Sequence, residues 1–456
     1  MKKLTLLAAA VSALLLPTLS ADSEKPNIIF IMADDLGYGD LGCYGQEQIL
    51  TPNIDQMCKE GKKFTRHYSG STVCAPSRCS LLTGKHIGHS YIRGNKELQP
   101  NGQKPLAKEE VTIAELLKPQ GYTTACIGKW GLGWDGSEGH PNKQGFDHFF
   151  GYLCQRRAHS YYPDYIWRNT DKVMLPGNNG KTGPHYTHDL MTEEALEFVR
   201  KNKDNPFFLY LAYAIPHTKF QVPDQAPYKD KDWAENHKIQ AAMITRMDRD
   251  CGTLLALLKE LKIDQKTLVI FTSDNGAHGI GGTLKQFKAS GILRGKKRDL
   301  FEGGVRVPMI ARWPGKIEAG SSSEHVSAFW DWMPTFCELA GAKNPDGGDG
   351  FSILPEILGK PKQRNHDSLY WEFYEQGGKQ AVLKGDWKAV RLGVSKNRNA
   401  PIQLFNLKKD PSEENDIANK FPEKLQEMAS LMKKAHSPSE IFKFSSKAKN
   451  KKKSKK

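Results

Sequence analysis

Long apolar runs are absent from this 456-residue chain everywhere except its N-terminus, which excludes a polytopic membrane protein. Closely paired cysteines are absent too: the eight cysteines are scattered and form no CxxC, so no zinc-binding motif is present. The sequence contains no internal repeat. Its 38% apolar and 26% charged residues are typical of a globular protein and exclude a fibrous or wholly disordered chain. The length predicts one large domain with a smaller one appended, or two comparable domains.

An excess of acidic residues is also missing, because 66 Lys and Arg outnumber 51 Asp and Glu and give a net charge of +15. Seven of these lysines fall in residues 447–456, and two more are Lys2 and Lys3. Without these nine lysines the body carries only about +6. No aromatic residues alternate with the lysines of the tail, so nucleic-acid binding is not expected. We expect residues 445–456 to form a solvated, disordered tail, with attraction to a polyanion as the alternative.

The first 20 residues have the layout of a secretory signal peptide. A basic start (Met1–Lys3) is followed by an apolar stretch (Leu4–Leu16) and by small residues at Thr18–Ala21, where cleavage would occur. The sequence has no cysteine at that point, so a lipid anchor is not expected, and it has no twin-arginine pair. We therefore expect residues 1–20 to be removed and the mature protein to be exported, to the periplasm or the extracellular space.

The pattern of apolar residues predicts an α/β domain around a large, mostly parallel sheet, extending over residues 21–360. Beyond residue 360, short strands separated by Gly- and charge-rich turns predict a small α+β subdomain over residues 361–444 with an antiparallel sheet. The expected strands of the first domain are 27–33, 123–128, 207–214, 267–272 and 307–312, and its expected helices are 53–60, 109–117, 189–201 and 238–261. The expected strands of the second are 368–374, 380–383, 387–392 and 403–406, before a helix at 422–434.

Two of these strands end in oxygen-bearing side chains. The first strand continues into Asp34 and Asp35, and the fourth ends just before Asp274 and Asn275. Ligands of open α/β sheets bind at the carboxyl ends of the strands, so the two pairs could form one site. Carboxylate and amide oxygens favour Ca²⁺ or Mg²⁺ over Zn²⁺. Either pair alone would be read as ordinary turn residues.

The segment Cys74–Gly84 reads CAPSRCSLLTG. It places Cys74 four residues before Arg78 at an expected transition from loop to helix, where free backbone N–H groups favour an anion. The segment resembles the signature of the formylglycine-dependent sulfatases, C-x-P-S-R-x-x-L-x-T-G, at every specified position. Further segments resemble that family in the same order, over nearly the whole mature chain except the lysine tail. They are residues 27–45, 51–55, 128–130, 216–217, 273–276 and 301–308.

The resemblance implies an alkaline-phosphatase-like α/β/α sandwich and a nucleophile made from Cys74. A formylglycine-generating enzyme would oxidise Cys74 to formylglycine, whose hydrate is a geminal diol. One diol oxygen would attack the sulfur of a sulfate ester, and the other would later expel sulfate and restore the aldehyde. The family's ligands for one Ca²⁺ correspond to Asp34, Asp35, Cys74, Asp274 and Asn275.

The resemblance also implies roles for four further side chains. Arg78 would orient the diol, Lys129 and Lys297 would contact the diol and the sulfate, and His217 would protonate or bind the departing oxygen.

One position departs from the pattern. Many members of the family have His directly after the Lys–Trp pair, whereas this chain has Gly131. That His is thought to help remove the proton from the second diol oxygen, which Gly131 cannot do. Either Lys129 or another histidine would take this role, or the enzyme would be slow or inactive. The candidate histidines are His140, His159 and His185.

The sequence says less about the substrate. Arg156, Arg157 and His159 lie in a segment rich in donors and aromatic residues, as a subsite for a sulfated sugar requires. Trp371 and Glu372 are a second candidate lining. We expect a sulfated galactose or N-acetylgalactosamine unit of a glycan.

Two other functions compete with this hypothesis. Phosphonate monoester hydrolases and phosphodiesterases of the same superfamily also use formylglycine and act on tetrahedral oxyanions. The other alternative is a protein that binds sulfated glycans after its chemistry has been impaired at Gly131.

Overall fold

The computed structural model describes residues 25–99 and 102–444. The predicted signal peptide and lysine tail lie outside these residues, and both stay predictions. Within the described ranges, no helix is long and apolar enough to cross a membrane.

The predicted large sheet is present and has eleven strands in the described chain. Its centre is β1 (Asn27–Ala33), which pairs in parallel with β10 (Thr267–Ser273) and with β9 (Phe207–Ala212). All seven residues of β1 are buried, and the six after Asn27 are apolar. Such a strand is covered on both faces, which explains its central place in the sheet.

The outer strands reverse direction, so the sheet is mixed at its edges. β11 (Arg306–Arg312) was expected among the buried strands and runs antiparallel to β10. The strands lie side by side in the order β12 (Ser321–Ser323), β2 (Lys62–Tyr68), β11, β10, β1, β9, β5 (Thr123–Lys129), β6 (His148–Tyr152), β7 (Tyr165–Arg168) and β8 (Asp171–Met174), and β13 (Ser327–Ala328) pairs with β2. A separate pair is formed by β3 (Glu97–Leu98) and β4 (Gly102–Gln103).

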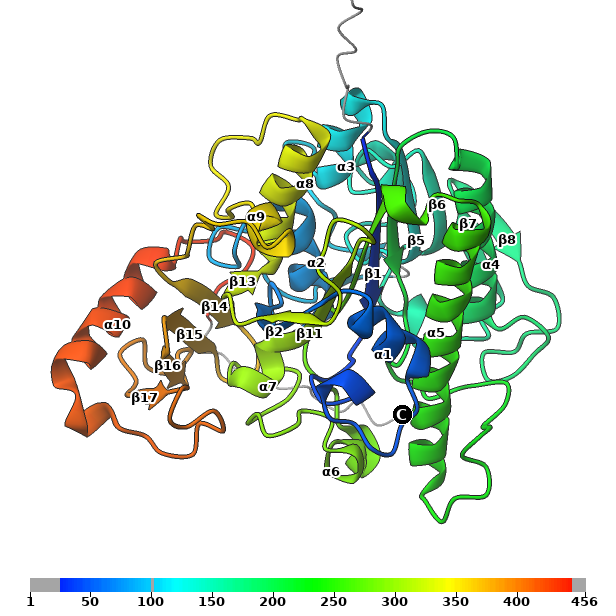
Figure 1. Ribbon diagram of the computed structural model, residues 1–456. Helices are drawn as coiled ribbons and strands as arrows, with labels where there is room; N and C mark the ends of the chain where they lie inside the picture. Colours follow the sequence, from blue (N-terminus) through cyan, green and yellow to red (C-terminus); the bar gives the residue numbers. More distant parts are fainter. Residues whose placement is uncertain (1–24, 100–101, 445–456) are drawn as a thin grey trace, which may run out of the picture.

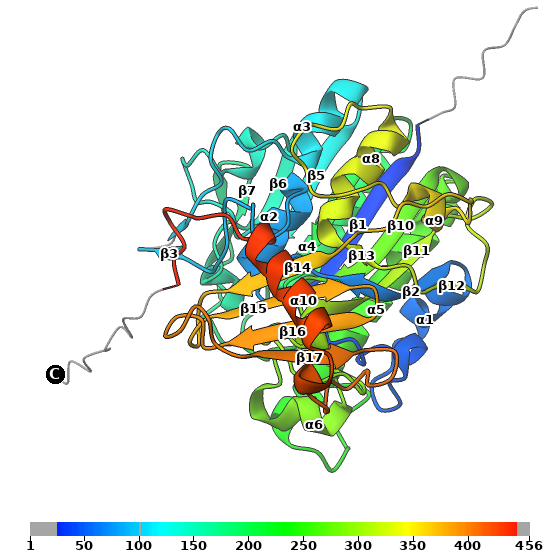
Figure 2. The ribbon, with the colours of Figure 1, turned by 90° about the vertical axis from the view of Figure 1, so that its left-hand side faces the viewer.

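Helices cover both faces of the sheet, as in an α/β/α sandwich (Figures 1 and 2). Ile29 and Ile31 of β1 pack with one set of helices, and Ile28 and Phe30 pack with the other. The first face carries α1 (Pro52–Lys59), α4 (Thr187–Asn202) and α5 (Glu235–Glu260), and the second carries α2 (Cys74–Thr83), α3 (Ile113–Leu117) and α8 (Trp332–Ala340). The short helices α6 (Thr283–Phe287), α7 (Glu302–Val305) and α9 (Leu354–Ile357) lie in connections.

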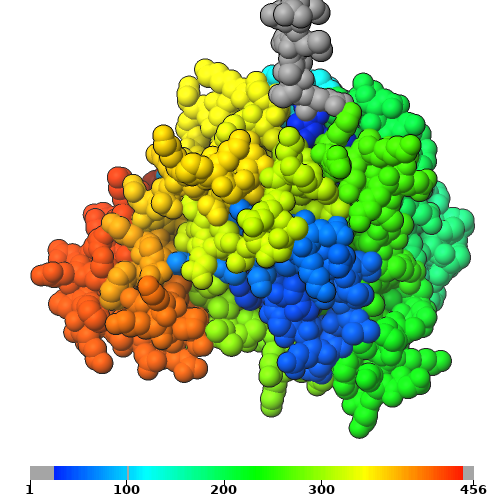
Figure 3. Space-filling model, viewed as in Figure 1, coloured from blue at the N-terminus to red at the C-terminus, as the bar shows by residue number. Residues whose placement is uncertain are grey.

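The C-terminal part contains the expected antiparallel sheet, with α10 (Pro422–Ala435) lying across it (Figure 2). In Figure 3 this part is the orange-to-red lobe beside the main body. Its strands are β14 (Leu369–Phe373), β15 (Lys379–Lys384), β16 (Trp387–Leu392) and β17 (Ile402–Asn406). Buried Lys388 of β16 bonds Glu302 of α7 at 2.7 Å and thereby ties the small sheet to the main body. The boundary at residue 360 stays a prediction.

Candidate active site at the carboxyl ends of the central strands

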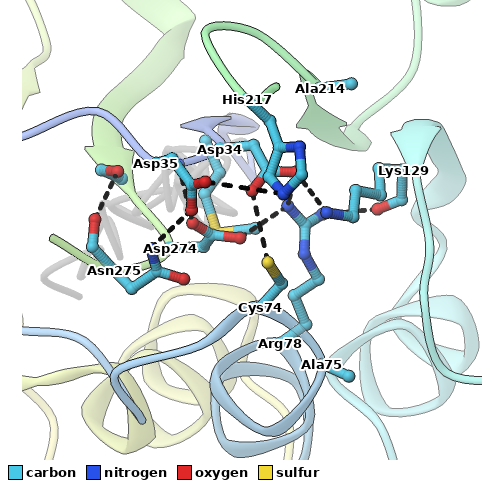
Figure 4. Close-up of polar contacts among 12 residues, drawn as sticks. Asp34, Asp35, Cys74, Ala75, Arg78, Lys129, Ala214, His217, Asp274 and Asn275 are labelled. Carbon is cyan, nitrogen blue, oxygen red and sulfur yellow. Dashed lines mark hydrogen bonds and ion pairs between the residues drawn. The ribbon is translucent and has the colours of Figure 1, made fainter. Parts of the chain in front are cut away.

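The two acidic strand ends meet. Ala33 pairs with Ser273 in the parallel register of β1 and β10, so the residues that follow leave the sheet side by side. The backbone N–H of Asp35 donates to Asp274 Oδ1 at 3.1 Å, which joins the two segments (Figure 4). The four side chains predicted as metal ligands, Asp34, Asp35, Asp274 and Asn275, are all buried.

A left-handed backbone at Asp35 explains why two successive carboxylates reach one cluster. Neighbouring side chains of an extended strand point to opposite faces. Asp35 has φ of 68°, a conformation that Asp adopts more readily than most residues, and this ends the alternation. Asp34 then contacts Cys74 while Asp35 accepts hydrogen bonds from Lys297 and Asn275.

Cys74 is the first residue of α2 and lies among these groups. Its Sγ is 3.4 Å from Asp34 Oδ1 and 3.3 Å from Lys297 Nζ. The preceding Val73 makes no side-chain cap. In the first turn of α2 the N–H of Ala75 donates to Asn95 Oδ1 at 3.1 Å, and Pro76 has no N–H. Burial, followed by the negative charge of Asp34, raises the pKa of the Cys74 thiol to about 12. The unmodified thiol is therefore held in its protonated, weakly nucleophilic form.

Arg78 lies one helical turn after Cys74 and so shares its face of α2. Its guanidinium donates to Asp274 Oδ2 at 2.8 Å, lies 3.5 Å from Asp34 Oδ2 and also donates to the backbone carbonyl of Lys129. Every residue of α2 is buried. Arg78 thus connects the helix to both acidic strand ends.

Two lysines each bond one carboxylate of the acidic pair. Lys129 is the last residue of β5, and its Nζ bonds Asp34 Oδ2 at 2.5 Å. Lys297, in the loop before α7, bonds both oxygens of Asp35 at 2.6 and 2.9 Å. Burial would lower the pKa of Lys297, but Asp35 and the other acidic neighbours raise it, so the amine stays charged. Burial would likewise raise the pKa of Asp34, yet the cations around it, Lys129 first, hold it well below its usual value.

His217 follows β9 and closes the cluster. Its Nε2 lies 3.5 Å from Asp35 Oδ2, and its Nδ1 bonds the backbone carbonyl of Thr218. Since a carbonyl only accepts, Nδ1 carries the proton of the neutral ring and Nε2 presents its lone pair to the cluster. Burial lowers the pKa of His217 to about 3. A bound anion near Nε2 would favour its protonation, which a general acid requires.

The oxygen atoms of the cluster fit a hard divalent cation. Nδ2 of Asn275 donates to Asp35 and to a backbone carbonyl, whereas its buried Oδ1 has no hydrogen-bond partner in the part of the chain that is described. One ligand atom each from Asp34, Asp35, Cys74 and His217 lie within 4.8 Å of one another. An unsatisfied amide oxygen beside crowded carboxylates is the donor set that Ca²⁺ prefers.

The first predicted substrate segment lies next to the cluster. The ring of His159 stacks on that of His217, with centroids 4.7 Å apart and planes at 13°. Arg156 is exposed and pairs with Glu97 at 2.9 Å. Arg157 pairs with Asp164 and lies over the ring of Tyr165.

The second predicted lining, Trp371 and Glu372, is wrong. Both are residues of β14 with no exposed surface. Trp371 donates through Nε1 to the carbonyl of Ser69, and Glu372 bonds His436 at 2.7 Å as well as the side chains of Arg93, Tyr370 and Tyr374. These contacts fill the junction between the small sheet and the main body, so neither side chain can reach a substrate.

Only one of the three histidines proposed to replace the missing one lies at the site. His140 caps a short 3₁₀ turn and packs on Phe149, and His185 lies in the loop before α4. His159 alone of the three contacts a residue of the cluster. The structure also brings in His278, which the sequence reasoning missed; its ring lies 6.3 Å from that of His217. The sequence did offer one indication of its place, because His278 follows the predicted metal ligand Asp274 by four residues.

Comparisons with known proteins agree with this geometry. A family model described as Sulfatase matches residues 26–342, and one described as N-sulphoglucosamine sulphohydrolase, C-terminal, matches residues 295–438. Arylsulfatase A of Homo sapiens is 34% identical over 462 residues, covering 90% of this chain and 88% of that protein. N-acetylgalactosamine-6-sulfatase of Canis lupus familiaris is 34% identical over 388 residues, covering 80% and 72%.

Among solved structures, that of Ps i-CgsB in complex with k-i-k-neocarrahexaose matches with a TM-score of 0.79 and 33% identity, covering 90% of this chain and 92% of that one. The expected alkaline-phosphatase-like fold is therefore confirmed. The chain belongs to the sulfatase family and is an enzyme that hydrolyses sulfate esters.

Proposed function

We propose that this sulfatase removes an O-sulfate from a galactose- or N-acetylgalactosamine-type sugar of a sulfated glycan, using formylglycine made from Cys74 and a bound Ca²⁺. The observation that carries the proposal is the position of Cys74. The cysteine of the modification signature stands at a helix N-terminus, between two acidic strand ends and the ammonium group of Lys297.

The chemistry requires an aldehyde at residue 74. A thiolate attacking sulfur would form a thiosulfate ester with no easy route for release. The hydrate of formylglycine offers two hydroxyl groups: one attacks sulfur and breaks the bond to the sugar oxygen, and the other loses its proton and reforms the carbonyl, which expels sulfate. Water then restores the hydrate. Partners of this proposal are a formylglycine-generating enzyme during maturation and the sulfated carbohydrate itself.

The chain's own cations would hold the sulfate and the diol. Arg78 and Lys129 bond the carboxylates around the nucleophile, and Lys297 bonds Cys74 itself. Their positive charge would offset the charge that builds up on the sulfate oxygens. Bound between Asp34, Asp35, Asp274 and Asn275, Ca²⁺ would supply further positive charge to the sulfate and the diol.

His217 would handle the proton of the leaving group. The sugar alkoxide is a poor leaving group, so protonation as the bond to sulfur breaks lowers the barrier. Nε2 of His217 faces the cluster, and the bond from Nδ1 to the Thr218 carbonyl fixes the ring. His159, stacked on His217, is the residue we assign to the proton of the second diol hydroxyl, in place of the histidine absent at Gly131.

Two relatives support the sugar class. One acts, by its name, on N-acetylgalactosamine 6-sulfate, and the matching crystal structure holds a neocarrahexaose. Both names refer to carbohydrates. The signal peptide predicted for residues 1–20 supports export, which would place the enzyme where such glycans occur.

The test is a panel of sulfated sugars assayed for release of inorganic sulfate, with protein produced together with a formylglycine-generating enzyme. We expect release from galactose- or N-acetylgalactosamine-type sulfates and faster turnover of nitrophenyl sulfate than of a nitrophenyl phosphonate ester. Preference for the phosphonate ester would support the alternative hydrolase, and binding without release would support the impaired binding protein.

A further inference from the structure

The space beside Gly131 is filled by the side chain of Gln155. Gly131 has φ of 77°, and a Cβ placed on it would lie 2.7 Å from Gln155 Nε2, 3.3 Å from Gln155 Cδ and 3.9 Å from Arg78 Cδ. Contacts of 2.7 Å do not occur for real Cβ atoms. A side chain at residue 131 and the present position of the Gln155 amide therefore exclude each other.

Backbone hydrogen bonds hold the segment that carries Gln155 next to Gly131. The N–H of Gly131 donates to the carbonyl of Leu153 at 3.1 Å, and that of Trp130 donates to the carbonyl of Tyr152 at 2.9 Å. These bonds fasten the segment after β5 to the segment after β6. Gln155 follows two residues later, and only 4% of its surface is exposed.

Gln155 nevertheless leaves a donor unused. Its Nε2 is buried and makes no hydrogen bond within residues 25–99 and 102–444. An amide buried without a partner costs stability, so buried polar groups are nearly always paired. The exceptions call for a specific explanation, and a donor that is paired only when a ligand is bound is one such explanation.

The surroundings indicate which ligand. Gly131 follows Lys129 by two residues, and the carbonyl of Lys129 accepts from Arg78. The space that Gln155 fills also borders Arg78, whose Cδ would lie 3.9 Å from a Cβ on Gly131, and Arg78 is one of the cations that face the sulfate in the proposed function. An N–H group next to a cation-lined anion site has an anionic oxygen as its natural acceptor.

We propose that Nε2 of Gln155 donates a hydrogen bond to an oxygen of the bound sulfate group. This inference rests on the proposed function, because it assigns Gln155 to the same sulfate site. An amide has no proton to exchange near neutral pH, so Gln155 orients and binds the anion, while proton removal stays with another group. Its contribution should be independent of pH.

Two substitutions test the assignment. Gln155→Leu keeps the size and removes the donor, and we expect kcat/KM for nitrophenyl sulfate to fall about 10- to 100-fold, as for the loss of one hydrogen bond to a charged group. Gln155→Glu places a carboxylate beside the sulfate, so the loss should be larger. The shape of the pH–rate profile should not change in Gln155→Leu, since no titrating group is removed.

Gln144→Leu is the matched control. Gln144 is also a buried amide, 2% exposed, but its Nε2 donates to the carbonyl of Glu138, away from the cluster. Comparable thermal midpoints for the two Leu variants, with activity lost only at residue 155, would support the assignment. Equal kcat/KM for Gln155→Leu and the unsubstituted enzyme would overturn it.

Binding provides a readout without turnover. Inorganic sulfate is titrated into Cys74→Ala protein with and without Gln155→Leu, and we expect the second substitution to weaken sulfate binding about 10-fold or more. Equal affinity would overturn the role of Gln155 even if the enzyme proves to be the proposed glycan sulfatase. Weakened affinity would support that role even if no sugar sulfate of the panel is hydrolysed. Absence of sulfate binding by the Cys74→Ala protein itself would overturn both proposals.

Discussion

Asp274→Asn should weaken metal binding without lowering the free energy of unfolding of the metal-free protein. Asp274 is fully buried, and burial followed by the charge of Asp34 raises its pKa to about 7. The folded protein thus binds this proton more tightly than the unfolded chain. Below pH 3.8, the ordinary pKa of Asp in the unfolded chain, this carboxyl does not lower the free energy of unfolding. As the pH rises from there towards 7, it lowers the free energy of unfolding of the metal-free protein progressively.

The magnitude follows from the size of the shift. A rise of about three pKa units corresponds to roughly 4 kcal/mol of unfolding free energy at pH 8. The shift already includes the attraction of Arg78, which pairs with Asp274 at 2.8 Å and lowers its pKa. This figure is an upper bound for the gain from Asp274→Asn, because the amide must also match the hydrogen bonds of the protonated carboxyl. We therefore expect the metal-free variant to be at least as stable as the metal-free unsubstituted protein at pH 8, with the difference vanishing near pH 4.

With Ca²⁺ present, the unsubstituted protein should become more stable than Asp274→Asn. Binding to the native state stabilises it by about 2.7 kcal/mol at a hundredfold excess over Kd, and Asp274→Asn should lose most of this gain. Its sulfatase activity should fall about 10²- to 10³-fold, because charge that faces the transition state is lost with the cation. The assay is urea unfolding with chelator or with Ca²⁺ at several pH values, beside turnover of nitrophenyl sulfate.

Asp40→Asn is the control for this experiment. Burial raises the pKa of Asp40 to about 7 as well, but its carboxylate bonds only the backbone N–H of Gly37 among the residues described. This variant should gain stability in the same way while keeping both activity and the response to Ca²⁺. The metal assignment is refuted if Asp274→Asn retains activity and calcium stabilisation. A metal-free variant far less stable than the unsubstituted protein would show that Asp274 acts mainly as the partner of Arg78.

Three further predictions concern the chemistry. Cys74→Ala should abolish turnover, yet the variant should still bind a sulfated sugar. In active unsubstituted protein, mass spectrometry of the peptide containing residue 74 should find formylglycine. An unmodified thiol in fully active material would contradict the mechanism. His217→Asn should lower the rate about 10²- to 10⁴-fold for a sugar sulfate but much less for nitrophenyl sulfate, whose leaving group needs no proton, and equal losses on both esters would argue against a general acid. His159→Ala should lower kcat strongly, whereas His140→Ala and His185→Ala should not; a dispensable His159 would assign the proton to another group.

The position of the site could be predicted because it depends on local sequence. Continuous apolar runs located β1 and β10, and the oxygen-bearing residues at their ends followed directly. The direction of β11 could not be read in this way, because an apolar run looks the same in a parallel and an antiparallel pair. β2 was missed because its sequence, KKFTRHY, is mostly polar and has neither a continuous apolar run nor a regular alternation.

Contacts between segments far apart in the chain could not be predicted from the sequence. Trp371 has the composition of a sugar-stacking residue, but its place under β2 and the loop after it depends on how the small sheet docks. The filling of the space beside Gly131 by Gln155 likewise depends on the pairing of β5 with β6. A glycine in one segment and a glutamine in another carry no local sign that they meet.

The complete burial of α2 has a consequence for the order of events during synthesis. A maturation enzyme cannot reach Cys74 once the fold has closed, because the residue is 1% exposed. Strand β14 of the small sheet packs next to this region, where Trp371 Nε1 donates to the backbone carbonyl of Ser69, five residues before Cys74. Residue 369 leaves the ribosome roughly 15 to 60 s after residue 74, at about 5 to 20 residues per second. That interval is the time in which the cysteine is accessible on the growing chain, so slower elongation should raise the fraction of converted enzyme, and refolding a thiol-bearing protein should not restore it.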